Sequence, residues 1–311
     1  MMSLHHSMLK FLERVNRAGV GDSALDTIRA SDFEGASIQE VSLVSIEDRM
    51  LPCAADIPVR IYAADECDEY PLMIFFHGGG FVRGGIRDHH DVLCRSLARA
   101  TGYKIISVGY RLAPEHKFPA ALNDCYAATK WVYQNAEELK GDRSTLTVFG
   151  NSAGGNLATV VCLLASERGE FSVRRQVLCY PVTDYYQDGE QRYASYQENG
   201  SGYYLTSKRM SEYWSMYLNL VEEGASPYAS PIRAKNLSHM PATLILTAEY
   251  DPLRDEAEQY ACRLLTSGVP VLIRRCKGML HGFLNILNFY GTKKDREEVM
   301  GLVGDFLKMK L

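Results

Sequence analysis

One stretch near the middle of the chain restricts the fold more than any other. Four apolar or β-branched residues, Leu146–Phe149, are typical of a short buried strand. They lead into the sequence Gly-Asn-Ser-Ala-Gly at positions 150–154, and a helix-forming run, Asn156–Glu167, follows. A chain that turns this sharply from strand to helix strains the backbone at the serine and needs small residues on both sides, which the two glycines supply. The pattern predicts a nucleophile elbow at Ser152, and the alternative is an ordinary glycine-containing turn.

Strand and helix signals alternate along most of the chain. The predicted strands are Glu40–Ile46, Ile57–Tyr62, Leu72–Phe76, Lys104–Tyr110, Leu146–Phe149, Gln176–Tyr180, Thr243–Thr247 and Val269–Arg274. The predicted helices are residues 7–18, Asp88–Ala100, Ala120–Glu138, Asn156–Glu167, Ser207–Leu220, Asp255–Ser267 and Lys293–Lys308. The first two strands alternate apolar and polar residues and are expected to pair antiparallel at one edge. The alternation that follows implies crossover connections, and therefore a mostly parallel sheet with helices on both faces.

The alternation is interrupted between Asp184 and Ser226. This segment is rich in tyrosine, and its helical part places Met210 and Trp214 on one side. One interpretation is a surface helix packed on the main sheet. We favour a cap, formed by this insertion (about 184–226) and the N-terminal region (about 1–38), over the carboxyl ends of the strands, where open α/β sheets bind ligands. Residues 1–311 are then a single α/β domain with a helical cap.

The composition excludes several classes of protein. The 311 residues carry a net charge of −4, with charges of both signs scattered, so there is no sign of a nucleic-acid footprint. No apolar stretch is long enough to span a bilayer, and residues 1–16 lack the apolar segment of a secretory signal. The eight cysteines are dispersed without a C-x-x-C pair, which favours reduced thiols and a cytoplasmic protein.

No cofactor and no metal are expected from the sequence. The adjacent pairs His5-His6 and His89-His90 are expected to diverge, with no carboxylate or cysteine at ligand spacing around them. The glycine-rich run at 77–81 lacks the Gly-Lys-Ser/Thr that would complete a P-loop.

The serine needs a base that takes its proton, and the base needs an anion that holds its tautomer. On sheets with a nucleophile elbow, the three residues follow one another along the chain as serine, acid and histidine. Only two histidines come after the serine. His239 precedes a predicted strand and therefore lies at the edge of the sheet away from the site. His281 follows the strand that ends near Arg274, so it lies on the correct side and is the predicted base.

The acid must lie between the serine and the histidine, directly after a strand. Asp251 follows the predicted strand Thr243–Thr247 and meets this condition, while Glu249 and Asp255 are nearby competitors. Asp251 also fits the start of a helix, because a proline comes next. The requirement of the serine and the histidine for an acidic partner favours Asp251 as the acid.

The run His-Gly-Gly-Gly-Phe at 77–81 directly follows the predicted strand Leu72–Phe76. Three consecutive glycines allow backbone N–H groups to point at one place without obstruction by side chains. The oxyanion of an acyl-transfer intermediate needs two or three such donors, and the Ala153 amide would complete the set. The alternatives are a phosphate-binding loop and a merely tight turn. His77 is interpreted as structural, holding the glycine loop in position.

Together these motifs resemble the hormone-sensitive-lipase family of α/β-hydrolases, and its bacterial carboxylesterase and acetyl-esterase branch is the best match. The matching motifs are His-Gly-Gly-Gly at 77–80, Tyr-Arg-Leu-Ala-Pro-Glu at 110–115, Phe-Pro-Ala-Ala at 118–121, Gly-Asn-Ser-Ala-Gly-Gly at 150–155, Ala-Ser-Pro-Tyr at 225–228, Asp-Pro-Leu-Arg-Asp-Glu at 251–256 and His-Gly-Phe at 281–283. The resemblance runs from about Ile57 to the C-terminus. It implies an α/β-hydrolase fold, a triad of Ser152, Asp251 and His281, and oxyanion donors at Gly79, Gly80 and Ala153.

The resemblance also implies a pocket for small acyl chains, a cap over it, and frequent dimerisation through the last strand of the sheet. The chain departs from the family at Asn151, where this branch usually has aspartate. The substitution removes a negative charge beside the nucleophile and leaves the triad assignment intact.

The expected activity is hydrolysis of short- to medium-chain carboxylic esters through an acyl-enzyme on Ser152. A non-catalytic ligand-binding protein on the same fold is one alternative, since a fold does not fix a function. A small amidase or peptidase that uses the same triad is another. Long-chain lipase action is disfavoured, because no strongly apolar lid or interface-anchoring stretch is present.

Overall fold

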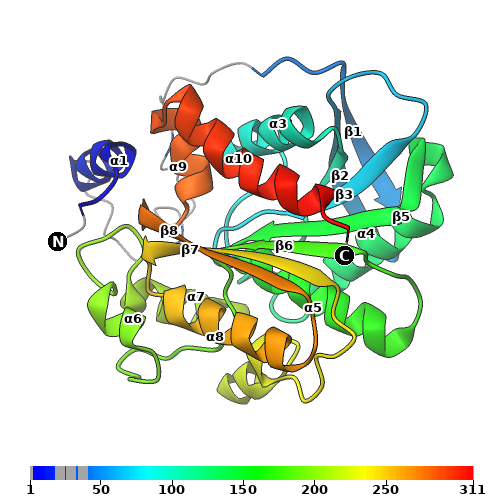
Figure 1. Cartoon of the computed structure of the whole chain (residues 1–311). Helices are drawn as coiled ribbons and strands as arrows, with labels where there is room; N and C mark the ends of the chain where they lie inside the picture. The colour runs from blue at the N-terminus through cyan, green and yellow to red at the C-terminus, as the bar shows by residue number, and fades with distance from the viewer. Residues whose placement is uncertain (1–2, 18–24, 26–32, 34–40, 311) are drawn as a thin grey trace.

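A single sheet forms the centre of the molecule in the computed structural model, which describes residues 3–17, 25, 33 and 41–310 (Figure 1). Residues 41–310 contain eight strands in the order β1-β2-β4-β3-β5-β6-β7-β8. The strands are β1 (Ser45–Pro52), β2 (Asp56–Ala63), β3 (Tyr70–Phe76), β4 (Lys104–Val108), β5 (Gly141–Asn151), β6 (Arg175–Cys179), β7 (Ala242–Tyr250) and β8 (Val271–Leu280). β2 pairs antiparallel with β1 and β4, and every other pair is parallel. The expected mostly parallel sheet is confirmed.

Helices cover both faces of the sheet (Figure 1). They are α1 (His6–Arg17), α3 (His89–Thr101), α4 (Ala120–Gln134), α5 (Ala153–Arg168), α6 (Ala194–Glu198), α7 (Ser207–Tyr217), α8 (Arg254–Thr266), α9 (Phe283–Tyr290) and α10 (Lys293–Lys308). Single 3₁₀ turns are η1 (Glu137–Leu139), η2 (Val221–Ala225) and η3 (Pro231–Arg233). α3, α9 and α10 pack on one face, and α4, α5 and α8 pack on the other.

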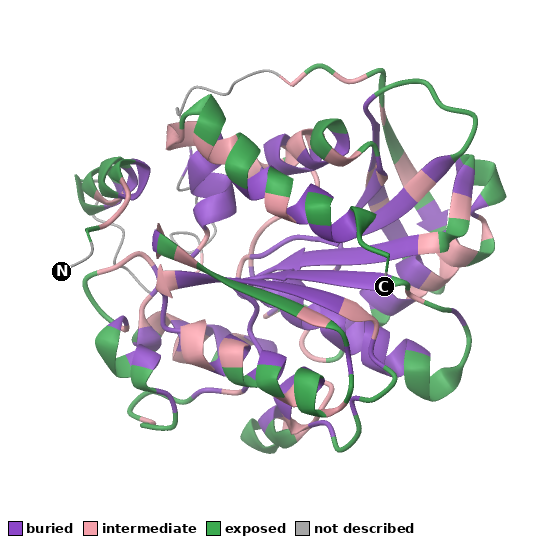
Figure 2. Ribbon diagram, in the orientation of Figure 1, coloured by how far each residue is buried: buried purple, intermediate pink, exposed green. Residues whose placement is uncertain are grey.

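The two hydrophobic cores follow from the twofold periodicity of a strand. Neighbouring residues of β3 and β5 point to opposite faces, so Ile74 and Val148 join the core under α4, α5 and α8, while Phe75 and Phe149 join the other core. β6 is fully buried, β3 and β4 are buried except for one residue each, and β5 is buried from Leu146 onward, whereas exposed residues concentrate on the outer sides of the helices and on β8 (Figure 2). A strand covered on both faces reads as a continuous apolar run, which is why the central strands were recognisable in the sequence.

Several predicted elements differ from the structure in position. The predicted strand Glu40–Ile46 is placed too early: Glu40 lies outside the described residues, residues 41–44 are not in a strand, and the strand is β1, which starts at Ser45 and pairs antiparallel with β2 at the sheet edge as expected. β1 is a mostly exposed edge strand, so its pairing with β2 sets its extent, and apolar alternation does not. The predicted helix Ala120–Glu138 ends at Gln134 and is followed by η1.

The region around the candidate histidine also differs from expectation. β8 continues to Leu280, beyond the predicted end at Arg274, so His281 follows the strand directly. The sequence pattern predicts no element after it, whereas α9 occupies Phe283–Tyr290 and is largely buried against α3 and α10. Eight residues are too few for a helical period to stand out, and the two polar residues, Asn285 and Asn288, are buried with the apolar ones instead of forming an exposed polar face.

Four of the parallel strands end beside the candidate site residues. β3 leads into His77, β5 into Ser152, β7 into Asp251 and β8 into His281. Parallel neighbours end at the same edge of a sheet, so these side chains meet although up to about 200 residues separate them. In Figure 1 the arrowheads of β7 and β8 point toward the side where α1 and α6 lie. Among the described residues, no helix has the length and apolar character needed to cross a membrane.

Candidate active site

Ser152, His281 and Asp251 form one continuous chain of hydrogen bonds. His281 Nε2 lies 2.9 Å from Ser152 Oγ, and His281 Nδ1 lies 2.8 Å from Asp251 Oδ2. All three side chains are buried, with Asp251 fully enclosed. A carboxylate that accepts from Nδ1–H leaves the Nε2 lone pair facing the hydroxyl, which is the tautomer that a general base requires.

The backbone at Ser152 has the strain expected of an elbow. Its φ of 56° lies in the left-handed region, which non-glycine residues rarely adopt. The two glycines that flank it have no room for a side chain: a Cβ on Gly150 would lie 2.0 Å from Gly154 O, and a Cβ on Gly154 would lie 2.0 Å from Phe76 O. The close approach of α5 to the strands therefore requires both glycines, as the sequence pattern indicates.

The competing acids have other partners. Glu249 accepts a hydrogen bond from the Gly278 N–H at 2.7 Å, and Asp255 accepts one from the Ser195 N–H at 2.8 Å. Asp251, in contrast, uses Oδ1 to accept from the Leu253 N–H at 2.9 Å and keeps Oδ2 for the histidine. The turn that starts α8 thus fixes the orientation of the Asp251 carboxylate. The rejected histidine, His239, is exposed and lies before β7, at the opposite end of the sheet.

The glycine loop faces the same pocket as the hydroxyl. Gly79 and Gly80 line a cavity of about 230 Å³ together with Ser152 and His281. Their φ values are 123° and 62°, and within residues 41–310 neither N–H donates to another backbone group. Ala153, the third expected donor, is the first residue of α5, where backbone N–H groups and the helix dipole favour negative charge. Of the residues that the sequence suggested, Gly79, Gly80, Ser152 and His281 line the pocket, while Asp251 lies behind His281 and Ala153 directly follows Ser152.

His77 packs beneath the surface of the glycine loop and holds it through contacts with Tyr110 and Gly78. Its ring is fully buried and stacks on Tyr110, with ring centroids 4.1 Å apart, and Tyr110 OH donates to His77 O at 2.6 Å. Burial lowers the pKa of His77 to about 4, so the imidazole is neutral at physiological pH. Nδ1 lies 2.9 Å from Gly78 O, which fits the structural role inferred for this histidine.

Asn151 is buried beside the nucleophile. Its Nδ2 donates weakly to Tyr180 OH at 3.4 Å, and its Oδ1 has no hydrogen-bond partner among the described residues. The Tyr180 ring also packs edge-on against His281, with centroids 4.9 Å apart. A neutral amide therefore occupies the position of the usual aspartate without disturbing the histidine.

Most of the remaining pocket wall could not be assigned from the sequence. It is formed by Val15 of α1, by Arg83, and by residues of the predicted insertion that include the charged side chains of Lys208, Arg209 and Glu212. Arg83 Nη2 donates to Tyr204 OH at 2.6 Å across a separation of 121 residues. A contact of this sequence separation leaves no periodic signal, and only the tyrosine-rich composition of the insertion hints at it.

The expectation that the adjacent histidine pairs diverge, with no carboxylate near them, is wrong. The His5 and His6 rings lie 4.2 Å apart beside Asp295, and the His89 and His90 rings lie 4.1 Å apart beside Asp88. Both pairs stand at a helix start: His5 precedes α1 and His6 is its first residue, whereas His89 and His90 are the first two residues of α3 and follow its N-cap, Asp88. In the first pair the carboxylate comes from the far end of the chain, and sequence spacing does not detect such a partner.

Glu256 connects α8 with the insertion. Its Oε1 accepts from the Thr183 N–H at 2.6 Å, and its Oε2 accepts from Tyr196 OH at 2.8 Å. The side chain is fully buried, and burial raises the pKa of Glu256 to about 8, against these hydrogen bonds. The folded protein therefore holds a proton here that the unfolded chain releases at a lower pH.

We expect Glu256 to make the protein less stable as the pH rises from about 4.5 to about 8. In this window the native state binds more protons than the unfolded state, so the free energy of unfolding falls with pH, by about 1.4 kcal/mol for each unit of pKa difference. Urea unfolding at pH 5 and pH 8 measures the change. Glu256→Gln should reduce the pH dependence of the free energy of unfolding, whereas Glu222→Gln, at an exposed site, should leave it unchanged. An equal pH dependence in wild type and Glu256→Gln would show that Glu256 does not carry this proton.

Comparison with known proteins agrees with the fold and with the site geometry. A family model described as the α/β-hydrolase fold matches residues 73–285. The chain is 36% identical to the arylesterase of Saccharolobus solfataricus, over 81% of this chain and 79% of that protein. It is 37% identical to the ethyl acetate hydrolase of Pseudomonas putida, over 74% of this chain and 72% of that protein.

Solved structures of esterases have the same architecture. A hyperthermophilic esterase from the archaeon Pyrobaculum calidifontis superposes with a TM-score of 0.89 at 36% identity, and covers 99% of this chain and 98% of its own. A thermostable esterase from Pseudomonas putida superposes with a TM-score of 0.90 at 34% identity, and covers 98% of this chain and 97% of its own. The chain therefore belongs to the α/β-hydrolase fold family, in the hormone-sensitive-lipase group of bacterial carboxylesterases that its motifs resemble.

Proposed function

We propose that the protein is a serine carboxylesterase that hydrolyses short- to medium-chain esters through an acyl-enzyme. The observation that carries the proposal is the chain of hydrogen bonds from Ser152 through His281 to Asp251, placed beside the glycine loop in one pocket. The naming of its relatives as an arylesterase and an ethyl acetate hydrolase supports the same reaction class. Turnover of p-nitrophenyl acetate and butyrate tests the proposal.

We assign a role to each side chain, and the hydrogen-bond geometry supports these roles. His281 Nε2 takes the Ser152 proton as Oγ attacks the ester carbonyl, and then gives it to the leaving alcohol. His281 next activates a water that attacks the acyl-enzyme and regenerates the serine. Asp251 remains ionised and stabilises the imidazolium that forms in each half of the reaction.

The N–H groups of Gly79, Gly80 and Ala153 are the proposed oxyanion donors. Gly79 and Gly80 line the pocket in a preformed loop and Ala153 is the first residue of α5, so little reorganisation is needed when the carbonyl oxygen becomes negative. The glycine at position 80 is required sterically as well, because a Cβ there would lie 2.3 Å from the Tyr213 ring.

We propose that the insertion and α1 act as a cap that limits the acyl chain. Leu205, Met210 and Tyr213 of the insertion line the pocket together with Val15 of α1. The two parts contact each other, since the Phe11 ring of α1 packs edge-on against Tyr204 with centroids 4.9 Å apart. A cavity of about 230 Å³ suits a short or medium chain better than a long one.

We expect kcat/KM for p-nitrophenyl esters to peak at a short or medium acyl chain and to fall by decanoate. Each methylene that fits the pocket is worth about 0.8 kcal/mol, or roughly fourfold, until the wall at Tyr213 is reached. Tyr213→Ala should move the peak to longer chains and raise decanoate relative to butyrate by about tenfold. Tyr133→Ala, outside the pocket, should leave the series unchanged. A wild-type rate that rises steadily to decanoate would contradict a limiting cap.

An amidase or peptidase with the same triad is the second candidate function. A matched pair of substrates, p-nitrophenyl acetate and p-nitroacetanilide, separates the two. Faster turnover of the anilide would favour the amidase. Binding of either compound without turnover would favour a ligand-binding protein.

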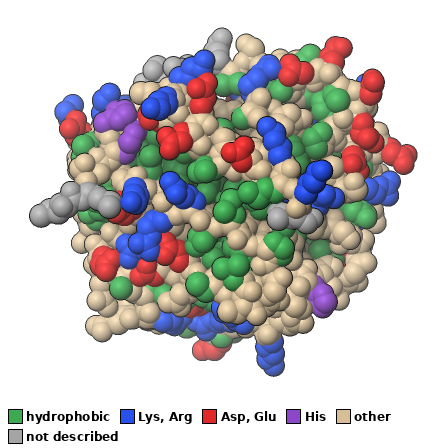
Figure 3. Space-filling view, viewed as in Figure 1, with side chains coloured by type: hydrophobic (Ala, Val, Ile, Leu, Met, Phe, Trp, Pro, Cys, Tyr) green, Lys and Arg blue, Asp and Glu red, His purple; other side chains and the backbone are tan. Residues whose placement is uncertain are grey.

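We propose a homodimer that forms through β8. β8 is an edge strand, and half of its residues are exposed, including Leu272 and Ile273, at 38% and 37%. In Figure 3 hydrophobic side chains gather near the centre of the face that carries β8, with charges of both signs around them. An unpaired edge with apolar side chains is suited to pairing with a second copy.

We expect sedimentation equilibrium to show a dimer, and Ile273→Lys to weaken it by at least about tenfold, because two lysines would then be forced together at the interface. Met50→Lys is the matched control: Met50 is an exposed apolar residue on β1, the opposite edge of the sheet. A wild-type protein that remains monomeric at high concentration would rule out this interface.

We also propose a cytoplasmic location. None of the eight cysteines forms a disulfide, and Cys94, Cys125, Cys162 and Cys179 are buried in the two cores. Reduced, buried thiols are typical of proteins in a reducing compartment.

A further inference from the structure

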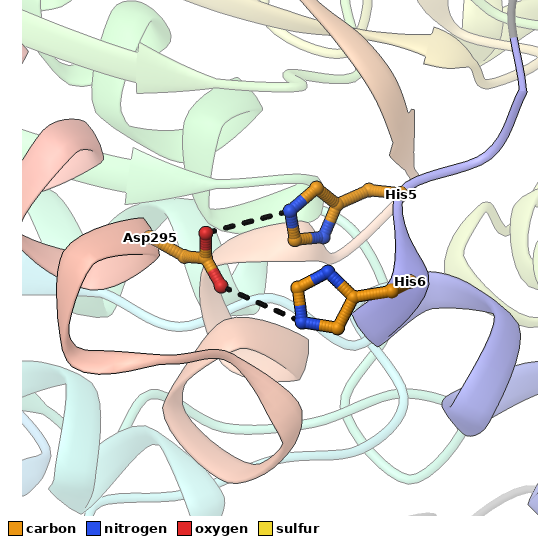
Figure 4. Close-up of side chains that lie close together, drawn as sticks. All are labelled: His5, His6 and Asp295. Carbon is orange, nitrogen blue, oxygen red and sulfur yellow. Dashed lines mark ion pairs between the residues drawn. The ribbon is translucent and has the colours of Figure 1, made fainter.

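Two histidines at the start of α1 meet a carboxylate in the first turn of α10. His5 Nε2 lies 3.4 Å from Asp295 Oδ1, and His6 Nε2 lies 3.9 Å from Asp295 Oδ2 (Figure 4). One possible ligand atom from each of the three residues lies within 4.8 Å of the other two. Segments about 290 residues apart in sequence therefore place three metal-binding side chains around one point at the surface.

We propose that His5, His6 and Asp295 bind a divalent transition-metal ion, of which Zn²⁺ is the best fit. Two imidazole nitrogens and one carboxylate oxygen are a donor set that suits Zn²⁺ and related ions. Tetrahedral Zn²⁺, with bonds of about 2.0–2.1 Å, holds its donor atoms roughly 3.3–3.4 Å apart. The 3.4 Å separation of His5 and Asp295 meets this value, and His6, at 3.9 Å, needs a small rotation. Water would complete the coordination.

The carboxylate is held by the start of α10. Asp295 Oδ2 accepts from the Thr292 N–H at 2.8 Å, in a capping box that leaves Oδ1 directed at His5. A ligand that is already ionised and held by a hydrogen bond binds a metal more tightly than a mobile one.

The histidines are held as well, with some competition from Ser7. The His5 N–H donates to Gly278 O at 2.9 Å, which fixes the start of α1 to β8. The Ser7 N–H lies 3.4 Å from His5 Nδ1, and Ser7 Oγ lies 3.2 Å from His6 Nε2. Coordination through Nε2 puts the proton of His5 on Nδ1 and therefore replaces the first of these contacts, which is long. The contact between Ser7 Oγ and His6 Nε2 is lost when the Ser7 hydroxyl rotates away, which frees Nε2 for the metal.

An ion at this site would fasten α1 to the body of the protein. Met8 and Phe11 of α1 are buried in the core under α9 and α10, and Val15 reaches the wall of the catalytic pocket. The free energy of metal binding would add to that of α1 docking, because the ligands come from both sides of this contact. The site is thus a structural clamp, separate from the proposed reaction at Ser152.

Titration of the full-length protein with Zn²⁺ by isothermal calorimetry tests the proposal, with Co²⁺ as a spectroscopic probe of four-coordination. We expect about one ion per chain and a rise in melting temperature on binding. His5→Ala, His6→Ala and Asp295→Asn should each weaken binding by at least about ten- to a hundredfold, since even supporting residues have effects of this size. Asp295→Asn is informative because its amide oxygen can still accept from the Thr292 N–H while its nitrogen cannot bind a metal.

Two control variants keep the result specific. His239→Ala removes an exposed histidine far from the cluster and should leave the affinity unchanged. His89→Asn disrupts the other candidate group, Asp88-His89-His90, and should also leave it unchanged. The absence of wild-type binding, its retention in the His5→Ala/His6→Ala double variant, or its loss in His89→Asn would each overturn the proposal. The readout is binding, so the result does not depend on whether the protein is an esterase.

Discussion

Replacing Ser152 by alanine is expected to lower kcat for p-nitrophenyl butyrate by about 10⁶-fold, because no other group takes the place of the attacking hydroxyl. The substitution removes one oxygen and keeps the Cβ, so the strained backbone at this position, φ 56°, is no worse for alanine than for serine. The glycine loop and the proposed cap remain in place. We therefore expect substrate binding, measured as the inhibition constant of a non-hydrolysable ester analogue, to change little.

The control for this experiment is Ser238→Ala, at an exposed serine before β7. Both variants should unfold at the wild-type temperature, which separates a lost nucleophile from a lost fold. Stopped-flow measurement should show a burst of p-nitrophenol from wild type wherever deacylation is slow, and none from Ser152→Ala. Turnover by Ser152→Ala within tenfold of wild type would mean that another residue attacks the ester.

The sequence was informative about this site because of the geometry of parallel sheets. The residues that follow parallel strands meet at one edge, so the order serine, acid, histidine together with predicted strand ends was enough to select His281 over His239. The choice of Asp251 over Glu249 and Asp255 follows from the same reasoning, and in the structure it is Asp251 that contacts the histidine. The glycines at 78–80 and those that flank Ser152 indicated the oxyanion loop and the nucleophile.

The features that were missed lack such regular geometry. β1 is an exposed edge strand whose start is set by its partner strand, and α9 is too short for a helical period to stand out and has no exposed polar face. The pairing of Arg83 with Tyr204, and of His5 with Asp295, depends on how distant segments pack. Composition suggested that a cap exists, but the identity of the side chains in the pocket wall could be read only from the packed structure.

Replacing Asp251 by asparagine is expected to lower kcat by about 10⁴-fold, with a small change in KM. The carboxylate now accepts from His281 Nδ1 at 2.8 Å, and its other oxygen accepts from the Leu253 N–H. An asparagine can keep the bond from Leu253 only by turning its NH₂ group toward the imidazole. The imidazole must then accept at Nδ1 and carry its proton on Nε2, where it can no longer take the proton of Ser152.

The competing carboxylates provide matched controls for this prediction. Glu249→Gln and Asp255→Asn keep an oxygen that can accept from the Gly278 and Ser195 N–H groups, so both variants should stay within about tenfold of wild type. Initial rates on p-nitrophenyl butyrate, with melting temperatures for all three variants, make the comparison. Loss of activity in either control together with an active Asp251→Asn would assign the acid to the wrong strand end. Loss of activity in Asp251→Asn together with two active controls would show that the reaction depends on the Asp251 carboxylate. All three variants remove one negative charge, but only Asp251→Asn removes the acceptor for the His281 Nδ1–H.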